Sequence, residues 1–382
     1  MRIFICLILL VTNLQAQRTQ TIEGMNLHSL ELSKTLYDRG ENLFCSPLSL
    51  STALAMTYAG ANGKTLEEYE TVMHYPGEQT FGEIKSFSDR LNDLGKFGNV
   101  SLNIDNALWF RLALKPDFVT RMKESFGASF YPLTVAKPIN EWANEKTKGR
   151  IPKVLEETDI TPDIRLVLTN AIYFKGKWKS TFDSAKTHDA PFYQTDGEKK
   201  DCKLMYQKSA FKYLENNNYQ AIELPYSGDD LSMVVLLPKR ESSLKQMLQS
   251  LNIKELDTQL RTLKNQKVEL WLPKFKLETS YELKDVLMQM GMNAPFNRAD
   301  FSEMTQDKTP LEISRIIQKA FVEMNEKGTE AAAVTVVMMA TESSINRHEL
   351  IIPQFRADRP FLFLIRDKQT GAILFTGGLE KP

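Results

Sequence analysis

The stretch GTEAAAVTVVMMATES, residues Gly328–Ser343, constrains the fold of this chain more than any other segment. Its first thirteen positions hold one charged residue and no proline, and most of its side chains are small or β-branched. Such a segment suits a β-strand, and on a surface it would invite pairing with a strand of another molecule. It therefore belongs inside a sheet, or it is kept outside one for a functional reason.

Read as a strand, the segment has two unequal faces. The uniformly small face consists of Thr329, Ala331, Ala333 and Thr335. The opposite face consists of Glu330, Ala332, Val334 and Val336. A row of Thr and Ala can slide between two existing strands, whereas Leu or Phe would overpack the core below. Taken alone, the pattern also fits an ordinary buried strand or an alanine-rich helix.

Length and charge narrow the class of protein. The 382 residues contain no Gly/Ser/Pro-rich linker, repeat or charge block, which favours one large domain. The 48 Lys and Arg balance the 48 Asp and Glu, so no strong field favours nucleic acid or an anionic membrane. A protein or a small molecule remains as the partner.

The N-terminus, MRIFICLILLVTNLQAQ, is typical of a secretory signal, with a short apolar core and a small residue at Ala16. We expect a signal peptide at 1–16, a secreted domain at 17–382 and no transmembrane span, because later apolar runs are too short. Removal of the signal leaves Cys45 and Cys202, which are either free buried thiols or a disulfide. The sequon at Asn99 is a candidate glycosylation site.

Helices and strands are mixed without a regular alternation, which indicates an α+β fold. Ser46 and Pro47 begin a helix that ends near Gly60, and further helices are expected from Met25 and from Ile139 to Lys148. Strands are expected at 166–174 and in KVELWLPKFKLE at 267–278, in a hairpin turning at 227–229, in a C-terminal hairpin and in ISRIIQKAFVEMNEKG, which leads to Gly328.

Motifs for catalysis and metal binding are incomplete. No G-x-S-x-G elbow occurs, and His348-Glu349 lacks the second histidine of a zinc site because position 352 is Ile. Asn62-Gly63-Lys64-Thr65 mimics a phosphate loop, but Tyr58 stands where its first glycine is needed, so we interpret it as a turn between helices. We expect no metal, no cofactor and no enzymatic activity.

Several long motifs together resemble the serpins. KAFVEMNEKGTEAAA resembles the reactive-loop hinge of inhibitory serpins, and LVLTNAIYFKGKWKSTF resembles a central strand of their large sheet. NLFCSPLSLSTALAMTYAGANGKT, INEWANEKTKGRIPKVL, FRADRPFLFLI and TGAILFTGGLEKP are similar to further family segments and occur in family order. The resemblance implies three β-sheets, eight to nine helices and an exposed reactive-centre loop at about 326–352.

The resemblance also implies a mechanism. A target serine protease attacks the loop, forms a covalent acyl-enzyme and is trapped when the hinge inserts into the large sheet as a strand. The implied hinge residues are Gly328, Thr329, Glu330, Ala331, Ala332 and Ala333. Because no proline interrupts them, we expect an inhibitor. A non-inhibitory carrier, storage or chaperone protein is the alternative.

Four positions match family residues beneath the opening sheet. Ser46 and Asn170 match the polar shutter, and Trp178 matches the aromatic of the breach, where the loop first enters. Gln318 stands where the family commonly has histidine, so hydrogen bonding is retained and a pH response is not. For each position, simple packing is the alternative.

The family distance from Gly328 places the scissile bond between Glu342 and Ser343, which suits a granzyme-B-like or glutamyl-specific protease. Arg347, Thr341 and Met339 are the alternative bait residues: Arg347 would attract trypsin-like enzymes, and Thr341, Met339 or Met338 elastase- or chymotrypsin-like ones. The segment 86–98 has balanced charge, so no heparin-type activator is indicated, and we expect a monomer.

Overall fold

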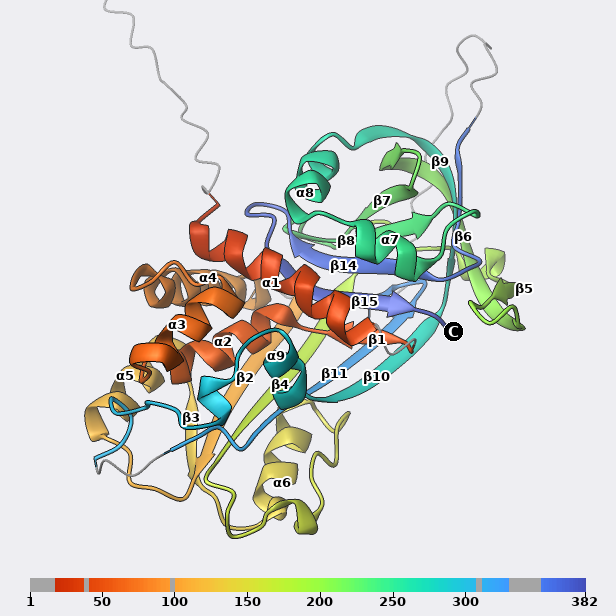
Figure 1. The fold of residues 1–382 in the computed structure, drawn as a ribbon. Coiled ribbons are helices and arrows are strands. Elements are labelled where there is room, and N and C mark those ends of the chain that lie inside the picture. Colours follow the sequence, from red (N-terminus) through yellow and green to blue (C-terminus); the bar gives the residue numbers. More distant parts are fainter. Residues whose placement is uncertain (1–17, 38–40, 97–99, 307–310, 330–351) are drawn as a thin grey trace, which may run out of the picture.

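The computed structural model describes residues 18–37, 41–96, 100–306, 311–329 and 352–382 (Figure 1). Within these ranges the chain forms nine α-helices and fifteen β-strands. The helices are α1 Gln20–Tyr37, α2 Pro47–Tyr58, α3 Gly63–Met73, α4 Gln79–Lys96, α5 Pro116–Phe126, α6 Ala136–Lys146, α7 Leu244–Ser250, α8 Ile253–Arg261 and α9 Lys284–Gln289. The strands are β1 Leu43–Cys45, β2 Val100–Phe110, β3 Ser129–Pro132, β4 Leu166–Lys177, β5 His188–Tyr193, β6 Lys199–Glu215, β7 Tyr219–Pro225, β8 Leu231–Pro238, β9 Lys264–Pro273, β10 Phe275–Glu282, β11 Arg315–Asn325, β12 Gly328–Thr329, β13 Gln354–Arg356, β14 Phe361–Asp367 and β15 Ile373–Leu379.

In the described part of the chain, the strands form two hydrogen-bonded sheets. One has six strands in the order β10-β11-β12-β4-β2-β3, and the other has nine in the order β1-β15-β14-β8-β7-β6-β9-β13, with β5 on β6. The larger sheet has two parts, because β6 pairs with β9 through 204–213 and with β7 only through 212–215. If the two parts of the larger sheet are counted separately, they and the six-stranded sheet make the three sheets that were expected. The predicted α+β class is confirmed.

The six-stranded sheet is covered on both faces. Even-numbered residues of β4 and β11, such as Leu168 and Ile316, belong to the main core with α2. Odd-numbered residues, such as Ala171 and Ile317, belong to a separate smaller core with Ile139 of α6. The helices α1 to α5 gather together, while α6 lies apart from them over the strands (Figure 1). The helix α6 therefore covers the face of β4 and β11 that α2 does not.

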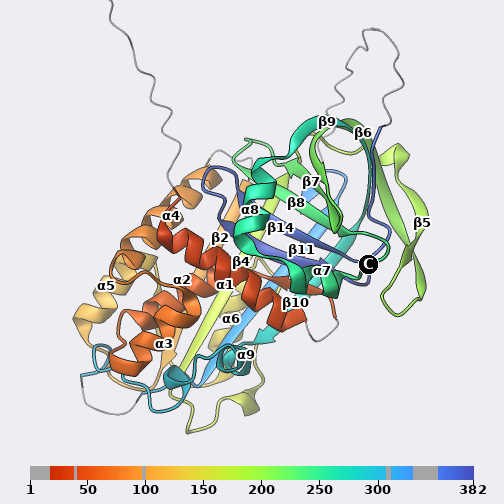
Figure 2. The same ribbon diagram turned by 45° about the horizontal axis from the view of Figure 1, so that its top comes forward.

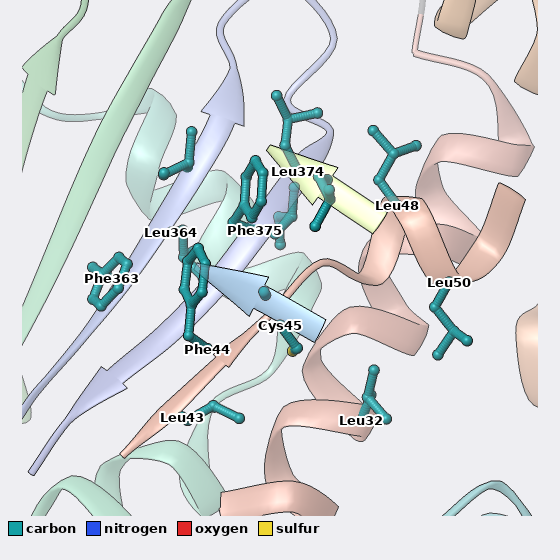
Figure 3. Packing of buried hydrophobic residues seen from close by; sticks show 14 of the residues in the cluster. Leu32, Leu43, Phe44, Cys45, Leu48, Leu50, Phe363, Leu364, Leu374 and Phe375 are labelled. Carbon is teal, nitrogen blue, oxygen red and sulfur yellow. The ribbon is translucent and has the colours of Figure 1, made fainter. Parts of the chain in front are cut away.

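The main core joins the two sheets. Phe44 of β1 stacks on Phe375 of β15, with ring centroids 5.4 Å apart, and Leu48 and Leu50 of α2 are fully buried beside them (Figure 3). Every residue of α2 is buried, as its apolar sequence predicts. Ser46 caps this helix by accepting a hydrogen bond from the Ser49 N–H at 3.2 Å, so the predicted helix start is confirmed.

The two cysteines of the described residues do not form a disulfide. Cys45 in β1 and Cys202 in β6 are free and buried. Burial raises the pKa of the Cys45 thiol to about 12 and that of Cys202 to about 11, which makes both thiols poor nucleophiles. The free-thiol interpretation is confirmed, and the pairing alternative is wrong.

Two features are absent from the described ranges. None of their helices has both the length and the apolar character that crossing a bilayer requires. In the same ranges, no three His, Cys, Asp or Glu side chains are grouped so that they could hold a metal ion.

Candidate functional site

The centre of the six-stranded sheet is a seam between two parallel strands. Residues Arg315–Ala320 of β11 pair with Val167–Ile172 of β4 (Figure 2). Beyond this seam β12 lies between the same two strands and is antiparallel to both. The chain thus leaves β11, turns, and returns for two residues as a new strand between β11 and β4.

The register of β12 is defined by four pairs. Gly328 pairs with Asn325 and Lys177, and Thr329 pairs with Met324 and Gly176. The β11 residues 321–323 lie between β12 and the seam. In the described part of the chain, they have no pairing partner on β4. The strands β4 and β11 therefore pair directly along the seam. At the other end they are separated by β12, where the chain enters the sheet.

Only glycine fits at position 328, where the chain enters the sheet. Its φ is +150°, and a Cβ atom built on it would lie 2.1 Å from the Gly176 carbonyl oxygen and 2.8 Å from Lys177 Cα. Both neighbours are backbone atoms, which cannot rotate away as a side chain can. Any other residue at 328 would push β12 out of the sheet or distort β4.

Two stacked aromatic side chains, Tyr226 and Trp178, lie next to Thr329. Thr329 is fully buried, and its Oγ1 lies 2.8 Å from Tyr226 Oη. The Tyr226 ring stacks on Trp178 at 4.7 Å, and Trp178 Nε1 donates to the Asn325 carbonyl at 3.0 Å. Burial raises the pKa of Tyr226, so its hydroxyl stays neutral and can hydrogen-bond to Thr329.

The turn before Gly328 is held by Glu326. Its Oε1 accepts from Thr187 Oγ1 at 2.9 Å, and its Oε2 lies 3.0 Å from Lys274 Nζ. Desolvation raises the pKa of Glu326, but hydrogen bonds from its own backbone, Lys274 and Thr187 outweigh that effect and lower the pKa below its usual value. The carboxylate therefore fixes the position from which the chain enters the sheet.

A buried polar network crosses the seam. Gln318 of β11 accepts from the Ser46 N–H at 3.0 Å and donates through Nε2 to the Ser46 carbonyl at 2.9 Å and to Asn170 Oδ1 at 3.3 Å. Asn170 Nδ2 then donates to the Ser49 carbonyl at 3.2 Å and to Asn106 Oδ1 at 2.6 Å. The direct bond between Gln318 and Asn170 joins the two strands that an entering strand would separate.

Comparison with known proteins identifies the family. The family model described as serpin (serine protease inhibitor) matches residues 23–382. The chain is a serpin. It is 38% identical over 363 residues to leukocyte elastase inhibitor of Xenopus laevis, covering 89% of this chain and 93% of that protein.

Solved structures of serpins agree with this assignment. The thermophilic serpin tengpin in its native state superimposes with a TM-score of 0.83 at 28% identity, covering 94% of each chain. Human thyroxine-binding globulin, crystallised in complex with thyroxine, gives a TM-score of 0.84 at 28% identity, covering 95% of this chain and 99% of that one. The serpin fold predicted from the sequence is confirmed. Serpins are protease inhibitors as a family and generally not enzymes.

The structure places six of the predicted serpin site residues. Gly328 and Thr329 enter the sheet, and four more surround the entry and the seam, namely Trp178, Ser46, Asn170 and Gln318. The hinge positions Glu330, Ala331, Ala332 and Ala333 lie outside the described residues. So do the bait candidates Met339, Thr341, Glu342, Ser343 and Arg347, the sequon residue Asn99 and the signal segment 1–16.

Several residues of this site were not predicted from the sequence, among them Asn106, Tyr226, Lys274 and Glu326. Asn106 lies directly opposite Asn170 in the β2–β4 register, and a polar residue within the apolar run NALWF was the available signal. Tyr226 lies just outside a hairpin strand, where nothing in the sequence indicates that it reaches Thr329. Lys274 follows β9, 52 positions before its partner Glu326, so only the fold brings the two together.

Proposed function

We propose that this serpin is a secreted suicide inhibitor of serine proteases. The protease serine Oγ attacks the carbonyl carbon of the bait residue, and the peptide C–N bond breaks. The serine proton passes through the protease's base to the leaving amine, which leaves an ester between protease and inhibitor. The freed hinge then enters the seam as a strand and carries the attached protease along the sheet.

The observation that supports this proposal most strongly is the pairing of β12. Gly328 and Thr329 already occupy the position of an inserted strand, hydrogen-bonded on both sides. Each further residue that enters gains pairing with β4 and β11, which replaces a single interface by two. Insertion is therefore favourable once the far end of the loop is released.

The register of β12 predicts where each loop residue arrives. One step forward along the loop corresponds to one step back along β4 and along β11, so Ala333 reaches Ile172 and Ala320, and Met338 reaches Val167 and Arg315. The small face of the loop then points to the main core, on the same side as Thr329. Met338 completes the strand, because Arg315 is the first residue of β11.

The length of the inserted strand argues against Arg347 as the bait residue and is compatible with Glu342. Glu342 follows Met338 by four residues, a tether of about 13 Å at roughly 3.3 Å per residue. Arg347 would leave a tether of about 30 Å, too slack to pull the protease against the sheet. Thr341 and Met339 give shorter tethers of about 10 Å and 3 Å. We keep Glu342–Ser343 as the scissile bond and a glutamyl-specific protease as the target class.

A carrier function is the second candidate. Thyroxine-binding globulin shares this fold and binds thyroxine, so the fold alone does not separate inhibitors from carriers. In the described residues, the cavity beneath α6 has a volume of about 10 Å³, and the groove between α6 and residues 152–157 is lined largely by polar side chains. The first is too small for a ligand larger than about one water molecule, and the second is too polar for an apolar ligand. The inhibitor proposal is therefore the better supported.

Incubation with a panel of serine proteases tests the proposal. A covalent complex that survives SDS, together with mass spectrometry of the released C-terminal peptide, would support it and identify the bait residue. We expect cleavage after Glu342 and complex formation with a glutamyl-specific enzyme, and weak reaction with trypsin-like enzymes, whose acidic pocket repels the glutamate. Cleavage without any stable complex would instead favour the carrier, storage or chaperone alternative.

The proposal includes secretion of the protein and the limits of its mature domain. The segment 1–16 has the composition of a signal peptide, which would leave a single mature domain at 17–382 with a reactive-centre loop at about 326–352 and a glycan at Asn99. N-terminal sequencing of protein recovered from the medium of expressing cells tests the first point. A retained Met1 in cell-associated protein would contradict it.

A further inference from the structure

We propose that Asn62 is a site of self-catalysed deamidation, in which the Gly63 backbone nitrogen and the Ser302 hydroxyl act on its side-chain amide. The product is aspartate or isoaspartate at the start of α3. The inference concerns the motif that mimics a phosphate loop in the sequence, and it does not depend on the proposed inhibition of proteases.

The reacting pair is the one Asn-Gly dipeptide of the chain, and it lies between α2 and α3 (Figure 1). Asparagine is chemically labile, and most of all before glycine, which has no side chain to hinder the attacking nitrogen. Asn62 is half-buried and Gly63 is exposed. A Cβ atom built on Gly63 would have no described atom within 4 Å. The five-membered succinimide ring therefore has room to form.

The start of α3 activates the attacking nitrogen. Gly63 is the first residue of this helix, and a helix leaves the N–H groups of its first turn without intrahelical acceptors. The positive end of the helix dipole stabilises negative charge at this point, which favours loss of the Gly63 N–H proton. The Asn62 side chain makes no capping hydrogen bond to the described backbone of α3, so the helix does not hold its amide in place.

Ser302 lies at the leaving group. Asn62 Nδ2 donates to Ser302 Oγ at 2.8 Å, in an exposed position. The Asn62 N–H donates to the Asp300 carbonyl at 2.9 Å, and the Ser302 N–H donates to Asp300 Oδ1 at 3.1 Å. The segment 300–302 therefore fixes the hydroxyl beside the nitrogen that has to leave. A hydroxyl at this distance can donate a proton to that nitrogen as it departs.

The reaction consumes one water molecule and releases ammonia. The Gly63 nitrogen loses its proton to a base in the solvent and attacks Asn62 Cγ, forming a C–N bond. The bond between Cγ and Nδ2 then breaks, and ammonia leaves with a proton from Ser302, which regains one from the solvent. Water hydrolyses the succinimide at either carbonyl, which gives aspartate or, with the chain continued through the side chain, isoaspartate.

One backbone rotation has to precede the attack. Asn62 is extended, with ψ at 167°, and ring closure requires this angle to change. The Asn62 carbonyl accepts from the Leu66 N–H at 3.3 Å, a long hydrogen bond that opposes the rotation only weakly. Gly63, whose φ is +50°, has the backbone freedom to follow. The fold therefore permits the geometry that the reaction needs.

The two products affect the junction differently. Aspartate places a negative charge at the positive end of α3 and keeps the backbone unchanged. Isoaspartate adds a methylene group to the backbone and shifts α3 relative to Asp300, whose N–H donates to Thr65 Oγ1 at 2.9 Å. The isoaspartyl form should therefore show faster hydrogen exchange at the Asp300 amide.

Peptide mapping by mass spectrometry tests the proposal on the full-length protein, incubated at neutral and at mildly alkaline pH. We expect Asn62 to become aspartate and isoaspartate, while exposed Asn297, which is followed by Arg298, stays an amide. The rate should rise about tenfold for each pH unit, as the deprotonated fraction of a group does far below its pKa.

Ser302→Ala separates the fold from the dipeptide. We expect this variant to deamidate several-fold more slowly than the wild type when folded and at the same rate when both are unfolded in guanidinium. Ser302→Thr keeps a hydroxyl and should react like the wild type. Equal rates in folded wild type and folded Ser302→Ala would overturn the proposal. So would an Asn62 amide that persists in the folded protein while the guanidinium-unfolded chain is converted.

Discussion

The hydroxyl oxygens of Tyr226 and Thr329 lie 2.8 Å apart, and both residues are fully buried at the point where the chain begins to enter the six-stranded sheet. This contact holds the first residues of the loop in the sheet before any cleavage. Gly328 and Thr329 are thus already part of the sheet in the intact protein.

Thr329→Arg should turn the inhibitor into a substrate. The guanidinium would replace a buried hydroxyl above Tyr226, and a buried charge without a partner costs several kcal/mol. We expect the loop to be cut at a normal rate while complex formation falls by at least about tenfold, the equivalent of only about 1.4 kcal/mol. Gel analysis of protease mixtures measures both products. Thr329→Ser keeps the hydroxyl and should inhibit normally, and an active Thr329→Arg variant would contradict this account of the entry.

Gly328→Ala should displace β12 without unfolding the protein. The added Cβ would lie 2.1 Å from the Gly176 carbonyl, so the short strand has to move away from β4. We expect slower trapping of protease and faster hydrogen exchange at the Trp178 amide, which now donates to the Lys327 carbonyl at 2.9 Å. Gly82→Ala in α4 is the control, since its Cβ would meet nothing within 4 Å. Unchanged exchange at Trp178 would show that β12 tolerates the methyl group.

Gln318→Leu should weaken the closed seam. It removes the Gln318 partners of the Ser46 N–H and of Asn170 Oδ1, whereas the Ser46 carbonyl keeps the Leu50 N–H at 3.1 Å. Each orphaned buried group costs about 1–3 kcal/mol. We expect the free energy of unfolding of the intact protein to fall by about 2–4 kcal/mol, with more polymer formed on heating. Gln207→Leu is the control, because Oε1 of that residue has no hydrogen-bond partner among the described residues. Equal effects of the two substitutions would argue against a seam-closing role for Gln318.

Acid should destabilise the protein through His28. Burial lowers the pKa of this histidine to about 4, from 6.5, and its Nδ1 lies 3.0 Å from the Val72 carbonyl. The unfolded chain then binds the proton more tightly than the folded one, so stability falls as pH drops from 6.5 toward 4, by about 3 kcal/mol in all. Guanidinium unfolding from pH 7 to pH 4 measures the slope. His28→Gln should remove this part of it, while exposed His188→Gln should not, and a wild-type slope in His28→Gln would contradict the assignment.

Local sequence patterns predicted much of the fold. The cap at Ser46, the turn at Gly228 and Asp229 with their positive φ values, and the C-terminal hairpin all follow from residue chemistry close in the chain. Helix starts were less accurate: the helix expected from Met25 begins at Gln20, and Thr21 and Ile22 of its first turn are buried in the folded protein. The segment 62–65 was predicted as a turn between helices, but only Asn62 precedes α3, and Gly63, Lys64 and Thr65 form the first turn of that helix.

The site was predictable only in part. Gly328 and Thr329 could be found because backbone freedom and small size are visible in the sequence, whereas Gln318 was found only through the resemblance to serpin motifs. The contacts of Tyr226 with Thr329 and of Lys274 with Glu326 could not, since they depend on which strands become neighbours in the folded protein. The register of β12, on which the insertion argument rests, is likewise a property of the folded sheet.

Comparison of the unfolding midpoints of intact and loop-cleaved protein tests the central claim most directly. If the severed loop enters between β11 and β4, the cleaved form must unfold at a clearly higher temperature and guanidinium concentration than the intact form, although one peptide bond has been lost. An equal or lower midpoint after complete cleavage at Glu342–Ser343 would show that the loop stays outside the sheet, and the proposed mechanism would be wrong.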